Sequence, residues 1–365
     1  MTLARIYGRE TGNGSLAVVS RGFERAFKQA GIFAGFYGLD TAESYTDGEV
    51  PSAGSSARHG VFTGPLGAVG KMFEAGRHEH HWVMIAPNSD QLPRSLVAEL
   101  KRYREKHSLR FLAPSGWASG IVRGFLGECT AVPHGVMPAF RPDPQAADEV
   151  RMLYRAGTFR VLHFSTSDRQ RKGTIELLQA WQILRRQGAL RSARLLCVLD
   201  YAAKLALDEA LSEGEVEDWP SCRQTVTITD RGDLGPEAMA RTLALAHVVC
   251  QPSRGEGFGL IPLEALSSGT PIVATAATGH LEYLDLERPP QGSVLITPGL
   301  DAPIDDLPGS QAPFVTPASI AHALKKSRDD WPALHAGAQA NAQVWGQLWA
   351  WETSLDPFVS RLRAT

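Results

Sequence analysis

Two glutamates stand eight residues apart in the segment SRGEGFGLIPLE, residues 253–264, which also contains three glycines. A strand-like run ending in QPS precedes this segment, so residues 253–259 are expected to form the turn at the carboxyl end of a parallel strand, where α/β proteins bind ligands. The helix predicted after Gly259 begins with backbone N–H groups that have no helical partner. Because the glycines leave these groups uncovered, we predict an anion site at this turn.

The two carboxylates, Glu256 and Glu264, would repel a phosphate bound beside them. Helix geometry separates them by roughly 8–10 Å. Both can be accommodated if they accept hydrogen bonds from hydroxyl groups while neutral N–H groups hold a diphosphate between them. A nucleotide sugar has this layout, with hexose hydroxyls, a diphosphate and ribose hydroxyls in order. The simpler alternative is a solvated loop acid at Glu256 and, at Glu264, an acid that complements the helix dipole.

The rest of the chain alternates short apolar strands with helical stretches, which is the pattern of βα units on parallel sheets. With 365 residues, the chain is long enough for two such domains. The proline-rich segment VPHGVMPAFRPDPQAADE is the predicted boundary between them. A helix is predicted over PEAMARTLALA, with Pro236 in its first turn, and one long terminal helix over AQVWGQLWAWETSLDPFVSRLRA.

Composition and charge narrow the class of protein. The formal net charge of −2 disfavours bulk nucleic acid as a partner, although residues 101–110, KRYREKHSLR, are strongly basic. This segment is either a solvated helix face or a surface for an anionic acceptor or a membrane. The four cysteines lack paired spacing and are expected to be buried thiols. No pattern of a signal peptide or membrane span occurs, so we expect a cytoplasmic protein, with peripheral contact at the inner membrane face as an option.

The acidic segment and its surroundings resemble a known signature. Glu256 and Glu264 with GFGL between them, the preceding PS, the following EALSSGTPIVAT, and Gly279 with Glu282 resemble the E-x7-E signature of retaining GT-B glycosyltransferases of family 4. The segment FLAPSGWASGIVRGFLGECTAVPHGVMPAFRP is similar to the end of that family's N-terminal domain.

This resemblance implies an α/β GT-B fold, in which two Rossmann-like parallel-sheet domains face a cleft. The acceptor-side domain would cover residues 1–142, with a tail helix over 343–365 that crosses back to it, and the nucleotide-sugar domain would cover 143–342. The implied reaction moves a sugar from a nucleoside-diphosphate sugar to an acceptor hydroxyl, with retention of anomeric configuration and without a metal or other cofactor. UDP, GDP and ADP all remain open as the donor nucleotide.

The resemblance also implies roles for individual residues. Glu256 would contact the hydroxyls of the donor sugar and Glu264 the ribose, while Lys172 and one of two arginines would neutralise the leaving diphosphate. The family's usual arginine position is Ser167 here, so Arg169 or Arg171 would substitute. The predicted catalytic residues are Glu256, Lys172 and Arg169; the predicted donor-binding residues are Gly12, Gly14, Arg171, Lys172, Arg231, Gly257, Phe258, Gly259, Leu260 and Glu264.

Other patterns compete with this interpretation. The segment GNGSLA, residues 12–17, fits a dinucleotide fingerprint and would indicate an NAD-dependent dehydrogenase, but Asp40 lies 28 residues after Gly12 where about 20 is usual. The resemblance instead assigns Gly12 and Gly14 to a glycine-rich loop near the diphosphate. A nucleotide-sugar epimerase of the same fold is a further alternative. The segment GPLGAVGK, residues 64–71, has Met72 where a phosphate loop needs Ser or Thr, and it is predicted to be helical.

On the acceptor side the sequence is less informative. Asn88, Ser89 and Asp90 follow a predicted strand and are candidate contacts for acceptor or donor sugar. The histidines of GRHEHHW are expected to be exposed rather than metal ligands, and no Asp-x-Asp pair indicates a metal site. The sequence does not distinguish between four classes of acceptor, namely a lipid-linked saccharide, a small molecule, a protein and a modified nucleobase.

Overall fold

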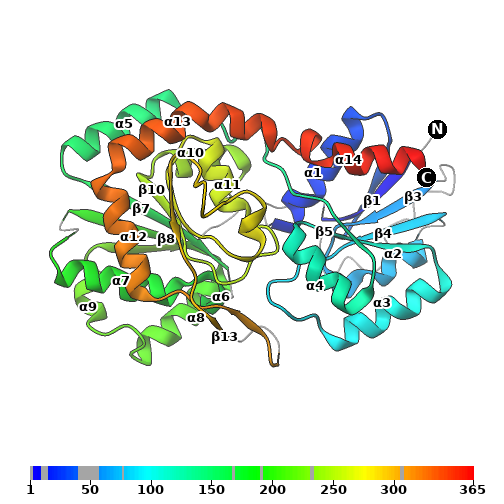
Figure 1. Ribbon diagram of the computed structural model, residues 1–365, viewed down its shortest axis with the longest axis horizontal. Coiled ribbons are helices and arrows are strands. Elements are labelled where there is room, and N and C mark those ends of the chain that lie inside the picture. The colour runs from blue at the N-terminus through cyan, green and yellow to red at the C-terminus, as the bar shows by residue number, and fades with distance from the viewer. Residues whose placement is uncertain are drawn as a thin grey trace. The chain divides into compact units, whose positions relative to one another are not determined.

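The computed structural model describes residues 3–9, 15–39, 57–75, 78–166, 169–189, 192–230, 234–304 and 308–365. They form two compact units, one of Met1–Met137 with Leu348–Thr365 and one of Pro138–Gln347 (Figure 1). The boundaries expected from the sequence were residues 142 and 342. Each unit is built on a six-stranded parallel sheet with helices around it, which confirms the predicted pair of Rossmann-like domains.

The sheet of the first unit has the strand order β2-β1-β3-β4-β5-β6. Its strands are β1 (Ala4–Gly8), β2 (Phe33–Gly38), β3 (His59–Phe62), β4 (His80–Met84), β5 (Leu109–Ala113) and β6 (Cys129–Ala131). The helices of this unit are α1 (Ser15–Gln29), η1 (Leu66–Ala68), α2 (Gly70–Ala75), α3 (Arg94–Lys106), α4 (Gly116–Leu126) and α14 (Trp351–Ala364). The predicted helix at GPLGAVGK is therefore the short pair η1 and α2.

Apolar side chains point alternately to the two faces of the sheet and form two separate apolar layers in this unit. Ile6 of β1 and Trp82 of β4 pack in one layer with α1 and α14, whereas Tyr7 and Val83 pack in the other with α3 and α4. Successive strand residues point to opposite faces, so both faces of the parallel sheet are covered.

The predicted single terminal helix is two helices, α13 (Trp331–Leu348) and α14. The break lies at Trp349, whose carbonyl accepts a hydrogen bond of 2.7 Å from the backbone N–H of Val136. Val136 also pairs with Ala350 as an isolated parallel bridge. This pairing directs the Trp349 carbonyl to Val136 and places Ala350 at the start of a new helix, which the apolar periodicity of the segment does not reveal.

The sheet of the second unit has the order β12-β11-β10-β7-β8-β9. Its strands are β7 (Phe159–Ser165), β8 (Ala193–Leu199), β9 (Val226–Asp230), β10 (Val248–Gln251), β11 (Ile272–Thr275) and β12 (Ser293–Ile296), beside a hairpin of β13 (Asp301–Pro303) and β14 (Gln311–Pro313). The helices are α5 (Pro144–Arg155), α6 (Arg169–Lys172), α7 (Thr174–Arg186), α8 (Tyr201–Ser212), α9 (Trp219–Cys222), α10 (Pro236–Ala244), α11 (Leu260–Ser267), η2 (Thr278–Glu282), α12 (Pro317–Asp329) and α13. Helices α7 and α12 lie side by side along the sheet (Figure 1).

Strand order reverses between β7 and β10, since the chain runs outward through β8 and β9 on one side and through β11 and β12 on the other. Ligands of open α/β sheets bind outside the carboxyl ends of the strands at such a switch point. The turn after β7 carries the basic segment, and the turn after β10 and the helix α11 that follows it carry the two glutamates singled out in the sequence. The topology therefore brings the two predicted motifs to one place.

Three of the four cysteines are buried as predicted, whereas the prediction for the histidines is wrong. The cysteines form no disulfide; Cys197, Cys222 and Cys250 are buried, and Cys129 is half-buried. The histidines of GRHEHHW are not exposed as predicted: His81 is buried, and its ring lies 5.6 Å from that of His78. The reason is that β4 already begins at His80, so the sheet covers these rings. Across the described ranges no group of residues could hold a metal ion, and no helix there is long and apolar enough to cross a membrane.

Candidate functional site

The site is built on the loop between β10 and α11, which carries Glu256. The loop ends at Gly259, whose φ of +84° lies in the left-handed region, and α11 begins at the next residue. Pro262 lies in the first turn of α11, and Gly269 follows its end with φ +76°, as the sequence predicts. A side chain at Gly259 would overlap the ring of His280. This close approach and the positive φ together require glycine at the head of the helix.

A second turn, after β7, meets this loop. Gly173 has φ +68° and lies so close to the carbonyl of Pro252 that a Cβ would overlap it. The backbone N–H of Arg254 also donates to the carbonyl of Arg171 at 2.7 Å. The two turns are thereby held together backbone to backbone.

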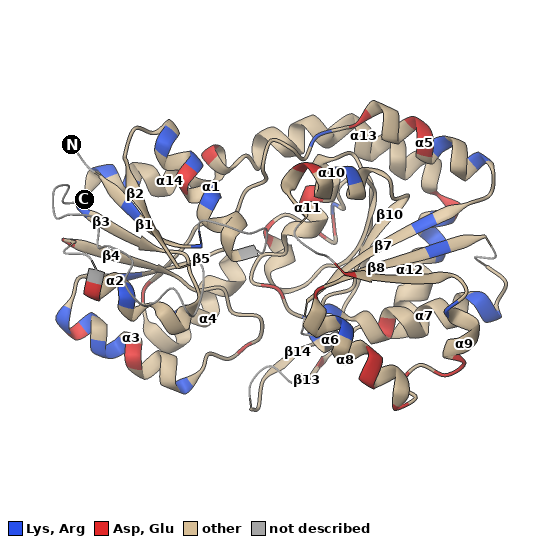
Figure 2. Cartoon of the chain, turned by 180° about the vertical axis from the view of Figure 1, so that it is seen from behind, with Lys and Arg blue, Asp and Glu red and all other residues tan. Residues whose placement is uncertain are grey.

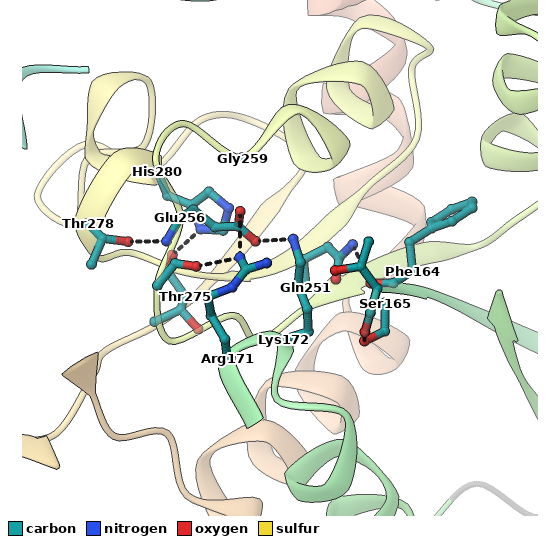
Figure 3. A network of polar contacts seen from close by, with 12 residues as sticks. Phe164, Ser165, Arg171, Lys172, Gln251, Glu256, Gly259, Thr275, Thr278 and His280 are labelled. Carbon is teal, nitrogen blue, oxygen red and sulfur yellow. Dashed lines mark hydrogen bonds and ion pairs between the residues drawn. The ribbon is translucent and has the colours of Figure 1, made fainter. Parts of the chain in front are cut away.

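Two cations of the β7 turn bind the carboxylate of Glu256 (Figure 3). Lys172 Nζ lies 2.6 Å from Glu256 Oε1, and Arg171 Nη1 lies 3.3 Å from Oε2. Arg171 Nη1 also donates to the carbonyl of Gly255 at 2.8 Å. The three side chains are between 8% and 14% exposed, so this is a largely buried cluster of two positive charges and one negative charge.

The electrostatics of this cluster fix the protonation state of Glu256. Burial alone would raise its pKa, but the charges of Lys172 and Arg171 outweigh burial and lower the pKa to about 2. Glu256 is therefore ionised at neutral pH and can accept hydrogen bonds but cannot donate one. It is suited to bind hydroxyl groups and unsuited to act as a general acid.

The backbone of Glu256 is held from a third side by η2. Thr278 Oγ1 accepts a hydrogen bond of 3.1 Å from the Glu256 N–H, and the Gly279 N–H donates to the Glu256 carbonyl at 2.8 Å. A Cβ at Gly279 would overlap that carbonyl, which explains the glycine. His280 then donates from Nδ1 to the carbonyl of Thr275 at 2.9 Å. Sequence reasoning singled out Gly279 but missed Thr278 and His280, because hydroxyl and imidazole contacts to a backbone leave no spacing pattern.

Arg254, two residues before Glu256, binds the β13–β14 hairpin. Its guanidinium donates to the carbonyls of Pro313, Ala302 and Pro303 at 3.2, 3.0 and 3.1 Å, and it lies over the ring of Phe314. A buried guanidinium can be satisfied by several carbonyls at once, because its donors point in fixed directions. Arg254 therefore fixes the β13–β14 hairpin to the loop that carries Glu256.

Three further predicted donor-site residues belong to this region. Glu264 lies buried on α11, Phe258 packs its ring 5.4 Å from that of Tyr283, and Leu260 opens α11. Of the two arginines left open by the sequence, Arg171 is the one whose side chain the structure describes. The predicted residues Gly12, Gly14 and Arg231 lie outside the described residues, as does Ser167. Asn88, Ser89 and Asp90 follow β4 in the other unit, where Ser89 is buried.

Replacing Gly259 by alanine is expected to lower the melting temperature by several degrees. A non-glycine residue at this φ costs about 1–3 kcal/mol, and the added Cβ must displace the buried His280 ring as well. Gly214→Ala is the matched control, because Gly214 has φ +81° with nothing within 4 Å of a Cβ. Thermal denaturation of both variants separates backbone strain from collision. Equal losses in the two variants would show that the contact with His280 is unimportant.

The site combines a buried ionised carboxylate, two cations beside it, and the start of a helix at a switch point. The cations can bind a group with multiple negative charges, and the carboxylate can bind hydroxyls. Within the ranges that the structure covers, no ligand set for a metal accompanies them. Such a site suits a ligand that carries phosphate and hydroxyl groups close together.

The sequence of the chain is similar to those of known glycosyltransferases. A family model described as Family 4 Glycosyltransferase in conflict systems matches residues 120–358, well over half of the chain. The chain is 33% identical over 150 residues to an MMP alpha-(1->4)-mannosyltransferase of Mycolicibacterium hassiacum, covering 40% of this chain and 32% of that protein. It is 31% identical over 144 residues to a D-inositol 3-phosphate glycosyltransferase of Arthrobacter, covering 39% of this chain and 31% of that protein. The chain thus spans about a third of the length of these curated relatives.

Solved structures share the fold over the full chain. A sucrose-phosphate synthase from Thermosynechococcus elongatus is similar with a TM-score of 0.70 and 16% identity, and 100% of both chains is covered. HepE from Anabaena, solved in complex with UDP and glucose, is similar with a TM-score of 0.71 and 13% identity, again over 100% of both chains. At these identities the likeness concerns the arrangement of the elements.

Proposed function

The chain belongs to the family 4 glycosyltransferases in conflict systems, and from this premise we propose that it transfers a sugar from a nucleoside-diphosphate sugar to an acceptor hydroxyl. The observation that carries the proposal is the cluster of Lys172, Arg171 and Glu256 at the β7–β10 switch point. In it, cations suited to a diphosphate lie directly beside a carboxylate suited to sugar hydroxyls.

Each residue has a defined part in the proposed reaction. Lys172 and Arg171 bind the diphosphate and stabilise the charge that it gains as it leaves the sugar. Glu256 accepts hydrogen bonds from the hydroxyls of the transferred sugar, and Glu264 accepts them from the ribose. Arg169, on α6 beside Arg171, is an additional candidate for the diphosphate.

The proposal extends to the stereochemistry and to the metal requirement. We propose transfer with retention of anomeric configuration, by displacement on the face from which the diphosphate leaves, with the departing phosphate taking the acceptor proton. Because Lys172 and Arg171 lower the pKa of Glu256 to about 2, its carboxylate is a weak base and is not suited to take that proton. Lys172 and Arg171 supply positive charge that a metal ion would otherwise supply to the diphosphate, so we propose a metal-independent reaction.

The donor is proposed to carry uridine or guanosine. HepE was solved with UDP and glucose, and a TarM structure that is similar with a TM-score of 0.56 contains UDP, which favours UDP as the first candidate. For the acceptor we propose an anionic molecule or surface that meets the end of α3. Figure 2 colours Lys and Arg positions, with acidic positions between them, along this helix, and Lys101, Arg102 and Lys106 are exposed.

A panel of nucleotides tests the proposal. UDP, GDP, ADP and their glucose and mannose conjugates are each added at saturating concentration, with NAD in a separate sample, and the melting temperature is measured. One of these ligands is expected to raise it, since a ligand at 100 times its Kd stabilises the folded state by about 2.7 kcal/mol. Stabilisation by NAD instead, with no response to the nucleotides, would contradict the proposal and indicate a dehydrogenase.

The reaction itself is followed with the donor that the panel selects. NMR of the anomeric proton in the transferred product is expected to show the configuration of the donor, and added EDTA is expected to leave the rate unchanged. Incubation with the donor alone is the control. Accumulation of an epimerised nucleotide sugar in that control would indicate an epimerase and not a transferase.

A further inference from the structure

Thr278 adopts a backbone conformation that threonine rarely takes. Its φ is +51°, and Asp218 is the one other described residue, glycines apart, with a positive φ. A β-branched side chain in the left-handed region is a genuine outlier, because its Cβ substituents crowd the backbone. Glycine would adopt the same φ without strain. A strained residue of this kind persists where the surrounding structure demands its side chain, most often at a functional site.

The side chain of Thr278 has a specific partner in Glu256. Thr278 Oγ1 accepts the hydrogen bond from the Glu256 N–H at 3.1 Å, and Thr278 is only 6% exposed. The next residue, Gly279, donates to the Glu256 carbonyl. The η2 turn therefore satisfies both polar backbone groups of Glu256, and only the Glu256 N–H depends on a side chain. Figure 3 shows Thr278 on the opposite side of Glu256 from Lys172.

We propose that Thr278 is a positioning residue that aims the carboxylate of Glu256 at the hydroxyls of the transferred sugar. Lys172 and Arg171 pull the carboxylate toward the diphosphate side, and the hydroxyl of Thr278 fixes the backbone from which this side chain extends. Without the hydroxyl, the buried Glu256 N–H loses its partner and the loop must move to find another. A displacement of about 1 Å at a reacting centre can reduce the rate roughly 100-fold. This inference rests on the proposed function of Glu256.

The test uses three substitutions that separate strain from hydrogen bonding. Thr278→Gly relieves the strain and removes the hydroxyl, Thr278→Ser keeps the hydroxyl, and Thr278→Val keeps the branched shape without it. Thr275→Val is the matched control, because Thr275 ends β11 three residues before Thr278 and its buried Oγ1 has no hydrogen-bond partner among the described residues. For each variant we measure the melting temperature, the Kd of UDP, GDP and ADP, and kcat and KM with UDP-glucose, GDP-mannose and ADP-glucose.

The expected pattern is a more stable but slower enzyme for Thr278→Gly. Its melting temperature should equal or exceed that of the wild type, its Kd for the nucleoside diphosphate should be unchanged, and its kcat should fall roughly 10- to 100-fold. Thr278→Val should lose kcat similarly, whereas Thr278→Ser and Thr275→Val should stay within about twofold of the wild type. Rescue by serine is a result that a purely structural role would not give.

Two results would overturn the inference, and they differ from failure of the proposed function. Wild-type kcat in Thr278→Gly, or equal losses in Thr278→Ser and Thr278→Val, would show that the hydroxyl does not position Glu256. If Glu256→Ala itself transferred sugar at the wild-type rate, the role of Glu256 would be wrong and the inference would fall with it. If none of the three nucleoside diphosphates bound, the proposed function and the inference about Thr278 would both be wrong.

Discussion

Replacing Glu256 by glutamine is expected to tighten the binding of a free nucleoside diphosphate while nearly abolishing sugar transfer. In the present structure the Glu256 carboxylate forms ion pairs with the two cations that we assign to the diphosphate. It lies 2.6 Å from Lys172 and 3.3 Å from Arg171. A diphosphate that binds there must displace this carboxylate or lie beside it. Glutamine has nearly the same shape but no charge, so both the competition and the repulsion disappear.

The size of the effect follows from the charges involved. Two unit charges 4 Å apart interact with about 4 kcal/mol at an effective dielectric constant of 20, and part of this is recovered when the carboxylate moves aside. We therefore expect the Kd of the diphosphate to fall about tenfold, which corresponds to about 1.4 kcal/mol. Transfer is expected to fall by a factor on the order of 100 to 1,000, as for other groups that stabilise a transition state electrostatically.

Replacing Lys172 by alanine is expected to have the opposite effect on binding of the diphosphate. Removing this cation should weaken binding of the diphosphate and also slow transfer, because the positive charge acts on both. Isothermal titration with UDP and GDP, together with transfer assays, distinguishes the two variants. Glu209→Gln is the matched control for loss of one negative charge, since Glu209 is exposed on α8. Weaker diphosphate binding in Glu256→Gln would show that the carboxylate does not compete for the cations.

This cluster shows how far the sequence alone could predict the site. The spacing of Glu256 and Glu264, and the glycines at 257 and 259, predicted a turn, a helix and an acid at its mouth, because these features are local and depend on few residues. The parallel order of the strands then explains why the basic turn after β7 comes to the same place. The topology therefore explains the contact between Lys172 and Glu256, which are 84 positions apart in the sequence.

The sequence was less informative where distant backbone groups meet. The pairing of Val136 with Ala350 breaks the predicted terminal helix, and no periodicity in either segment indicates it. The strain at Thr278 could not be predicted either, because threonine favours extended backbone and nothing local demands φ > 0. The histidines at the start of β4 were wrongly predicted to be exposed, since polar residue type was given more weight than their place in a buried strand.

The buried histidines of both units lead us to expect that the folded protein is sensitive to mild acid. Burial lowers the pKa of His59, His81, His163, His247 and His335 to about 4, and that of His134 to about 3. In the unfolded chain each imidazole has a pKa near 6.5. Between these values the unfolded state binds more protons than the folded state, so stability falls as the pH falls through this window.

His247 illustrates why protonation is unfavourable in the folded state. Its Nδ1 accepts a hydrogen bond of 2.9 Å from the backbone N–H of Arg160, and its Nε2 donates to the carbonyl of Val150 at 2.9 Å. The neutral ring satisfies both neighbours. A second proton would have to sit on Nδ1, facing the Arg160 N–H, so the hydrogen bond would be replaced by repulsion.

The melting temperature is therefore expected to be nearly constant between pH 7.5 and 7 and to fall steeply between pH 6.5 and 5. At pH 5.5 each of these histidines removes about 1 kcal/mol of stability, and six of them together remove several kcal/mol, a large part of the 5–15 kcal/mol typical of a domain. His335→Leu, which replaces a buried ring stacked on Trp331, should reduce the slope with pH. His322→Gln, at an exposed position on α12, should not. A melting temperature that stayed constant down to pH 5 would mean that these imidazoles are protonated without unfolding, which requires that their surroundings open to water while the sheets remain intact.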